Sequence, residues 1–117
     1  MTTPTTITID SIRYVREDSL PQAASFAVPE TGVPFEIGKA YLIRTVTMTL
    51  TGRVTAIIGS FLVLEDAAWI ADTGRFTECI KDGTVNECEP VAVPVRVSMP
   101  SIVDAYDWTH PLPRSIK

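Results

Sequence analysis

The feature that most constrains this chain is a series of three alternating segments separated by two short, glycine-containing turns. The segments "AYLIRTVTMTL" (residues 40–50), "RVTAII" (53–58) and "FLVLED" (61–66) are rich in β-branched residues and alternate in polarity, as strands do. The turns are "TG" at 51–52 and "GS" at 59–60, and the second is a glycine-first hairpin turn. Turns this short join antiparallel neighbours, so the sequence predicts a three-stranded meander.

Two further strands are expected toward the end of the chain. The stretch "PVRVSMPSIVDAYDW" indicates strands over residues 95–98 and 101–108, with a tight turn at 99–100. The sequence therefore predicts a mostly-β fold of five short, strongly bent strands, which is the plan of a small SH3-like barrel. The tail "THPLPRSIK" is too rich in proline for a regular element and should lie over the surface.

The segment between the third and fourth expected strands should leave the barrel. Residues 67–92 show no period of two, and within them "TGRFTECIKDG" is typical of a short helix. Thr73 is expected as the N-cap of this helix, and Gly83 as the residue that ends it. The barrel should thus carry an excursion with one short inserted helix.

The first part of the chain, residues 1–36, is expected to form an arm in front of a domain that spans residues 37–117. "TITIDSIRYVRE" (6–17) alternates well enough for a strand, with one phase slip near Ser11. The following "SLPQAASFAVPETGVPFEIG" cannot form a long regular element, because it is broken at Pro21, Pro29, Gly32 and Pro34. This segment should be an extended linker that lies on the barrel or on a neighbouring subunit.

Composition limits the class of protein. A chain of 117 residues suits one domain, and a formal net charge of −4 argues against a partner bound mainly through its phosphate backbone. The start of the chain has no secretory signal, and its apolar runs are far shorter than a membrane span. A soluble, cytoplasmic protein is expected, and in that compartment Cys79 and Cys88 should be free thiols. Their spacing, without a further cysteine or histidine nearby, makes a poor zinc motif. No cofactor is expected.

Residues 40–108 resemble the Sm/Lsm family. The first signature of that family is a glycine after strand one, then alternating apolar residues, then an apolar strand that ends in an acid. "TGRVTAIIGSFLVLEDA" matches it in order, with Gly52, Val54, Ile57, Leu62, Leu64 and Asp66. The second signature is a strand, a tight turn and a strand that begins Ile-Val, and "VRVSMPSIVDA" (95–105) matches its shape. The resemblance implies an Sm-like barrel and a ring assembled through edge strands.

Two departures from the Sm pattern concern RNA. The RNA-contacting Asp and Asn of the first signature would fall near residues 58–61, where this chain has Ile, Gly, Ser and Phe. The Arg-Gly pair of the second signature is replaced by Met99 and Pro100. The resemblance therefore does not extend to the family's RNA pocket, and an Sm-type RNA binder is the weakest of the functions considered.

A looser resemblance covers more of the chain. "YLIRTVTM…GRVTAI…LVLEDAAWI…G…E…IVDAYDW" is similar to a group of small phage and prophage proteins without a described activity. In those proteins, too, a strand with Arg-Thr leads into a hairpin, a "VLEDA"-like strand end, a tryptophan and an irregular excursion. This resemblance implies a viral accessory protein, located in the host cytoplasm or in the virion.

Arg44 is the most informative charge, because it interrupts an apolar face of the first expected strand. It could contact an anion that lines a pocket or the lumen of a ring. The alternative is an arginine at the barrel rim, extended along apolar surface or paired with Asp66 or Asp104. Arginines are usually exposed or paired, so the alternative is the commoner outcome.

Trp69 is the second candidate for a ligand contact. A tryptophan can stack on a base if arginines lie nearby, and here Arg53 opens the neighbouring expected strand while Arg75 follows six residues later. Capping the open end of a small barrel is the commoner role for an aromatic residue at the end of a strand, for Trp69 as for Trp108. Arg44, Arg53, Trp69 and Arg75 are together the predicted ligand-binding residues, for a small anion or a nucleotide.

Signatures of catalysis and of metal binding are weak. His110, the single histidine, has no neighbouring nucleophile or orienting carboxylate in "DWTHPLP", and no phosphate-binding loop or hydrolase motif occurs. The acidic residues between 65 and 89 lack the spacing of a cation-binding loop, which favours a solvated negative face.

Two functions from different classes remain. The first is a non-enzymatic assembly module that forms a homo-oligomer, such as a ring closed by edge-strand pairing. The second is a protein that binds a small ligand or nucleotide through the residues named above. Neither function requires a membrane or a metal.

Overall fold

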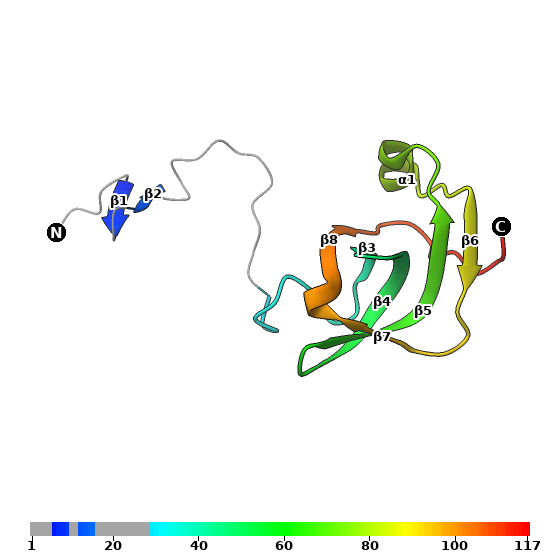
Figure 1. Ribbon diagram of the computed structural model, residues 1–117, viewed down its shortest axis with the longest axis horizontal. Helices are drawn as coiled ribbons and strands as arrows, with labels where there is room; N and C mark the ends of the chain where they lie inside the picture. Colours follow the sequence, from blue (N-terminus) through cyan, green and yellow to red (C-terminus); the bar gives the residue numbers. More distant parts are fainter. Residues whose placement is uncertain (1–5, 10–11, 16–28) are drawn as a thin grey trace.

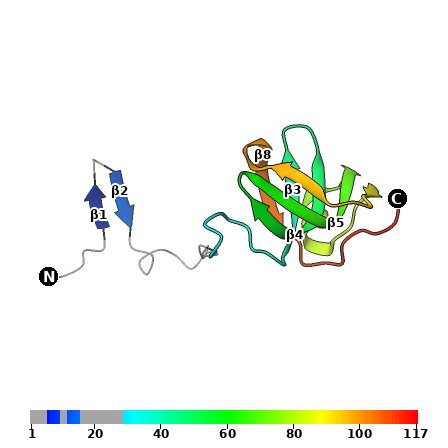
Figure 2. The same ribbon diagram turned by 90° about the horizontal axis from the view of Figure 1, so that it is seen from below.

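The structure is a computed structural model that describes residues 6–9, 12–15 and 29–117. Within the first part, β1 (Thr6–Ile9) and β2 (Ile12–Val15) pair with each other in antiparallel register (Figures 1 and 2). The prediction of a single strand over residues 6–17 is wrong, because two strands stand on either side of the phase slip near Ser11. Of the linker predicted over residues 19–38, the part up to residue 28 lies outside the described residues.

Six antiparallel strands form the main sheet within residues 29–117 (Figure 1). Their bounds are β3 (Ala40–Thr45), β4 (Thr49–Ile58), β5 (Phe61–Asp72), β6 (Glu87–Pro90), β7 (Val95–Ser98) and β8 (Ile102–Asp107). The strand order is β6-β5-β4-β3-β8, and β7 pairs with β5 as well. The predicted mostly-β class is confirmed.

The prediction of five strands is wrong, because β5 is longer than the alternation suggested. It does not stop at Asp66 but continues to Asp72, and its two halves have different partners. The first half pairs with β7, and the second half pairs with β6, a strand that the sequence did not reveal. Residues 67–92 are thus partly sheet. β7 and β8 do not pair with each other, so the sheet formed by the described strands is open.

The predicted turn at 51–52 is also wrong. β3 ends at Thr45, whose side-chain oxygen accepts hydrogen bonds from the backbone N–H groups of Thr47 (3.3 Å) and Met48 (3.1 Å). A threonine that bonds the backbone of the next residues favours a turn, although "TVTMT" reads as a continuous strand. The turn predicted at 59–60 is confirmed, with Gly59 at a φ of 58°.

Gly52 lies inside β4 because two strands approach each other closely there. A Cβ atom at this position would lie 3.1 Å from Cβ of Leu64 and 3.3 Å from Cβ of Ala67. Glycine within a strand often marks such a close approach.

We expect Gly52→Ala to destabilise the protein by about 1–3 kcal/mol, because the added methyl group overpacks the contact between β4 and β5. Chemical denaturation followed by circular dichroism measures the loss. Gly59→Ala is a comparison with a different cause: no heavy atom lies within 4 Å of a Cβ at Gly59, so any loss there comes from its left-handed φ of 58° and not from overpacking. If Gly52→Ala were as stable as the natural chain, the close approach would be refuted.

Both faces of the sheet are buried. The front core consists of Phe35, Tyr41, Ile43, Leu50, Val54, Leu62, Leu64, Ala67 and Val97, and the back core of Leu42, Ala68, Ile70, Cys79, Val85, Cys88 and Trp108. Successive residues of a strand point to opposite faces, so Leu42 enters the back core between two residues of the front core. Phe35, from the segment predicted as an arm, packs in the front core.

The back core is covered by α1 (Phe76–Asp82) and by the tail that follows β8. The predicted helix is confirmed, and so is Gly83 as its left-handed C-cap. The predicted N-cap is wrong: Arg75 occupies this position without a side-chain cap, and the hydroxyl of Thr73 donates to the carbonyl oxygen of Gly74 instead.

Hydrogen bonds hold the tail along its length. The indole N–H of Trp108 donates to the carbonyl oxygen of Pro111 at 3.2 Å, and Nε2 of His110 donates to that of Ile80 at 2.8 Å. Further on, Lys117 and Cys88 exchange two backbone hydrogen bonds of 3.0 Å, so the tail extends the sheet beside β6. Cys79 and Cys88 are free thiols buried in the back core.

Candidate functional site: the groove along β8

β8 is an edge strand of the sheet, and the hydrogen-bond pattern shows which of its backbone groups face outward. The N–H of Trp108 donates to the carbonyl oxygen of Ala40 on β3. Because hydrogen-bonded positions alternate along an antiparallel pair, Tyr106 and Asp104 also point their backbone groups at β3. Ala105 and Asp107 therefore turn their N–H and C=O groups away from the sheet.

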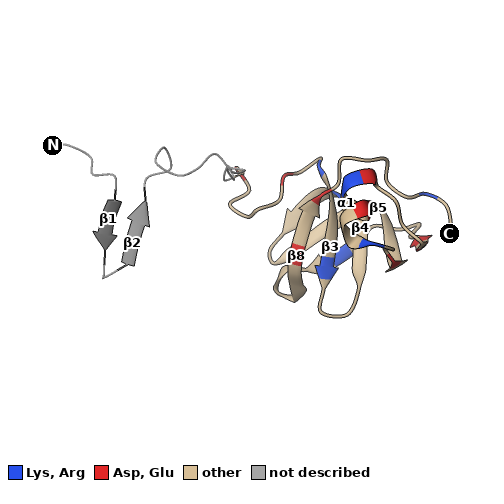
Figure 3. Cartoon of the chain, turned by 90° about the horizontal axis from the view of Figure 1, so that it is seen from above, with Lys and Arg blue, Asp and Glu red and all other residues tan. Residues whose placement is uncertain are grey.

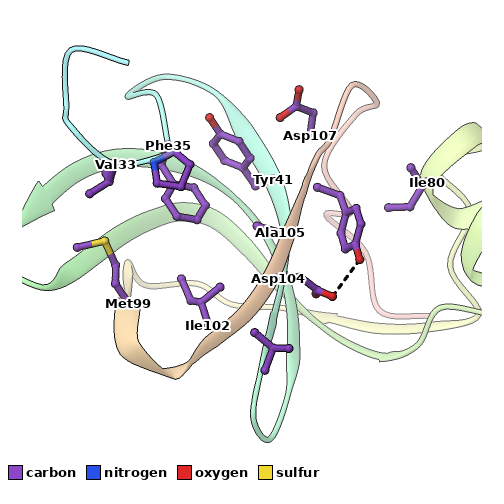
Figure 4. A pocket seen from close by; sticks show the side chains of 12 residues that line it. Val33, Phe35, Tyr41, Ile80, Met99, Ile102, Asp104, Ala105 and Asp107 are labelled. Atoms are coloured by element: carbon purple, nitrogen blue, oxygen red, sulfur yellow. Dashed lines mark hydrogen bonds between the residues drawn. The ribbon is translucent and has the colours of Figure 1, made fainter. Parts of the chain in front are cut away.

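A groove of about 700 Å³ runs along this free edge. One wall is apolar and contains Val33, Phe35 and Met99, and the other contains Ile80 and Tyr106. Figure 4 shows these two walls on opposite sides of the β8 ribbon. The groove thus combines unpaired backbone donors and acceptors with apolar surface on both sides.

The wall that contains Phe35 is held in place by local hydrogen bonds. The hydroxyl of Thr31 donates to the carbonyl oxygen of Phe35 at 2.7 Å, and the phenolic oxygen of Tyr41 accepts from the N–H of Glu36 at 2.8 Å. The rings of Phe35 and Tyr41 meet edge to face at 5.1 Å. This arrangement fixes the point at which the chain enters the sheet, directly beside the groove.

The opposite wall is anchored by Arg44. Its guanidinium donates two hydrogen bonds to the carboxylate of Asp104, the one from Nε at 2.7 Å. The same carboxylate accepts from the hydroxyl of Tyr106 at 2.9 Å, and Cζ of Arg44 lies 5.1 Å from the ring centroid of Phe76. Arg44 therefore has the paired role that the sequence left open, and it links β3, β8 and α1.

This anchor should make stability depend on pH. Hydrogen bonds from Arg44, and to a lesser extent from Tyr106, hold the pKa of Asp104 below its usual value. A carboxyl group with a lowered folded-state pKa stabilises the fold above the unfolded pKa of about 3.9, and the stabilisation is lost as pH falls through the folded value. We expect the melting temperature of Asp104→Asn to fall less steeply below pH 5 than that of the natural chain. Identical slopes in thermal denaturation would contradict this role.

Arg53 and Asp66 form a second ion pair, on β4 and β5. Nη1 of Arg53 lies 2.6 Å from the carboxylate of Asp66, and the guanidinium of Arg114, from the tail, approaches the same carboxylate at 3.9 Å. Asp66 adopts a left-handed backbone conformation, with a φ of 52°, where the pairing between β4 and β5 shifts register. The pKa of Asp66 is lowered, chiefly by its hydrogen bond from Arg53.

The remaining two predicted ligand contacts lie on other elements. Trp69 is in the middle of β5, opposite Leu50 and Glu89, with 39% of its surface exposed, whereas Trp108 is buried. Arg75 precedes α1, and its Nε lies 3.9 Å from the carboxylate of Glu78. Figure 3 shows basic and acidic positions side by side in α1.

Each of the three arginines predicted to contact a ligand is thus paired with a carboxylate of its own. An anionic ligand would have to compete with Asp104, Asp66 and Glu78 for them. The ligand-binding role of Arg44, Arg53, Trp69 and Arg75 stays a prediction. The groove along β8 was not foreseen, because the alternation of "IVDAYD" indicates a strand but not whether that strand lies at an edge.

Among residues 6–9, 12–15 and 29–117, no group of three or more histidine, cysteine, aspartate or glutamate side chains could hold a metal ion. None of the described helices has the length and apolarity that crossing a membrane requires. Comparison of the chain with protein-family models, with curated proteins and with solved structures found no match.

Proposed function

We propose that the protein is a non-enzymatic assembly module whose subunits join through sheet edges, with the edge of β8 as the receiving surface. The observation that carries the proposal is the groove, in which the outward backbone groups of Ala105 and Asp107 lie between two apolar walls. Free strand edges with flanking pockets bind added strands, because the backbone supplies affinity and the pockets supply specificity.

Surface composition supports the same function. Val103 projects from the irregular part of β8 with 66% of its surface exposed, and Val46 and Met48 are exposed in the turn between β3 and β4. Exposed apolar residues next to a free edge favour association over isolation in water. Copies joined in this way close into a ring or dimer, the oligomer proposed for an Sm-like or SH3-like barrel. The sequence resemblance to phage proteins supports a viral accessory role for that assembly.

The test is the solution mass of the full chain and of two edge variants, measured by light scattering at micromolar concentration. Ala105→Pro and Asp107→Pro each remove an outward N–H group that β3 does not use, so the fold should survive while strand addition is blocked. We expect a multiple of the single-chain mass for the natural protein and the single-chain mass for both variants.

Ala105→Ser is the matched control, because it keeps the N–H group at the same position and should remain assembled. Circular dichroism checks that each variant is folded. A natural chain that is monomeric at every concentration tested would sink the proposal, and so would proline variants that are folded and still fully assembled.

A further inference from the structure

We propose that the strand received by the β8 groove is β2, Ile12–Val15, of a second copy of this chain. The inference rests on the proposed function and names the donor in the assembly. Residues 12–15 already have strand conformation and pair with β1, so a two-stranded hairpin is available to extend the sheet beyond β8. The resulting continuous sheet would run from β6 through β3 and β8 to β2 and β1.

The shape of the groove favours a narrow donor. β8 lies between the wall that contains Phe35 and the wall that contains Ile80 (Figure 4). The other free edge in the described sheet is that of β7, which pairs with β5. If β7 were the donor, the rest of its sheet would have to fit between the two walls as well. A hairpin joined to the rest of the chain only through residues 16–28 can enter between the two walls without that body.

The residues of β2 match the two walls. In the sequence Ile-Arg-Tyr-Val, Ile12 and Tyr14 fall on one face of a strand, and Arg13 falls on the other. A strand of this pattern, added with its apolar face toward Phe35 and Met99, would turn its basic face toward Asp104. Asp104 is the acidic side chain of β8 on that face, and its carboxylate, which also binds Arg44, complements the charge of Arg13.

The length and the path of the chain permit exchange between copies. Residues 16–32 can span up to roughly 56 Å at about 3.3 Å per residue. This reach exceeds the length of β8, which has six residues. Val33 and Pro34 line the groove, so the arm starts at the rim of its own groove. Two copies that bring these rims together place the arm of each beside the groove of the other.

The experiment compares proline substitutions on the two possible donor strands in the full chain. Backbone groups of neighbouring strand residues point in opposite directions, so Arg13→Pro and Tyr14→Pro between them remove the outward N–H of β2 and its pairing with β1. On β7, the N–H of Met99 donates to Ser60, so by the same alternation Arg96 faces outward and Arg96→Pro blocks the free edge.

We expect both β2 variants to fall to the single-chain mass, and Arg96→Pro to keep the mass of the natural assembly. Ala23→Pro, in the proline-containing segment after β2, is the matched control and should also stay assembled. If Arg96→Pro dissociates while the β2 variants do not, β7 is the donor and this inference is overturned, although the proposed function stands. A natural chain that is monomeric overturns the proposed function as well.

A mixing experiment tests exchange between copies directly. Tyr14→Pro keeps an intact groove and Ala105→Pro keeps an intact arm, so each should be monomeric alone while an equimolar mixture should form a dimer. A folded pair that stays monomeric on mixing would show that the arm does not enter the groove of another copy, and would overturn the inference.

Discussion

Replacing Gly83 with alanine should destabilise the protein by about 2–4 kcal/mol, from the combined costs of a left-handed backbone and of overpacking. Gly83 ends α1 at a φ of 75°, and a Cβ atom there would lie 2.5 Å from Cγ of His110. The ring cannot move away freely, because its Nε2 is bonded to the carbonyl oxygen of Ile80. Urea denaturation followed by tryptophan fluorescence and circular dichroism gives the change in free energy of unfolding.

Gly32→Ala is the matched control for this substitution. Gly32 has the same φ of 75°, but no heavy atom lies within 4 Å of its would-be Cβ. This variant should lose only the cost of the left-handed conformation, about 1–2 kcal/mol. The difference between the two variants measures the clash with His110, and equal losses would show that the tail does not press on the end of α1.

A double substitution separates the clash from other effects at the same position. A Cβ atom at Gly83 would lie 2.5 Å from Cγ and 2.7 Å from Cβ of His110, and His110→Gly removes both atoms. The combination Gly83→Ala with His110→Gly should therefore cost less than the sum of the two single changes. An additive result would mean that Gly83 and His110 are not coupled. The cycle therefore tests whether the tail is packed against α1, which the sequence "THPLP" gives no reason to expect.

The elements that were predictable from sequence are those fixed by local chemistry. The turn at Gly59, the short helix that ends at Gly83, and the strands on either side of Met99 all depend on glycine, proline and alternation within a few residues. The turn after Thr45 was missed because every residue in it is compatible with a strand. Gly52 was misassigned because a glycine required by a neighbouring strand resembles a turn glycine in the sequence.

The candidate site could not be predicted in the same way, because it joins residues that are distant in sequence. Phe35, Ile80 and Met99 reach the groove from three different connections, and only the order of the strands shows that β8 is an edge. The arginines have a different role from the one that their residue type predicts. Their residue type suggested anion contacts, whereas Asp104 and Asp66 take up the charges of Arg44 and Arg53. Pairing across a sheet depends on register, which the alternation alone left undetermined.

Leu42→Ala should cause a loss of about 2–5 kcal/mol, the range for truncating a fully buried leucine whose surroundings collapse only partly. Leu42 has none of its surface exposed and lies in the back core, among side chains from β5, β6 and α1. Leu62, equally buried, lies in the front core, so Leu62→Ala is the matched control.

Because one sheet separates the two cores, both variants should weaken the same cooperative unfolding transition. Circular dichroism and tryptophan fluorescence would then report a single midpoint that shifts to lower denaturant concentration in each variant. A small effect of Leu42→Ala beside a large effect of Leu62→Ala would mean that α1 and the tail add little to the fold. Two separate transitions would mean that the back layer unfolds alone. A single transition in both variants would show that the back layer unfolds together with the front core. This layer includes Ile80, which lines the groove.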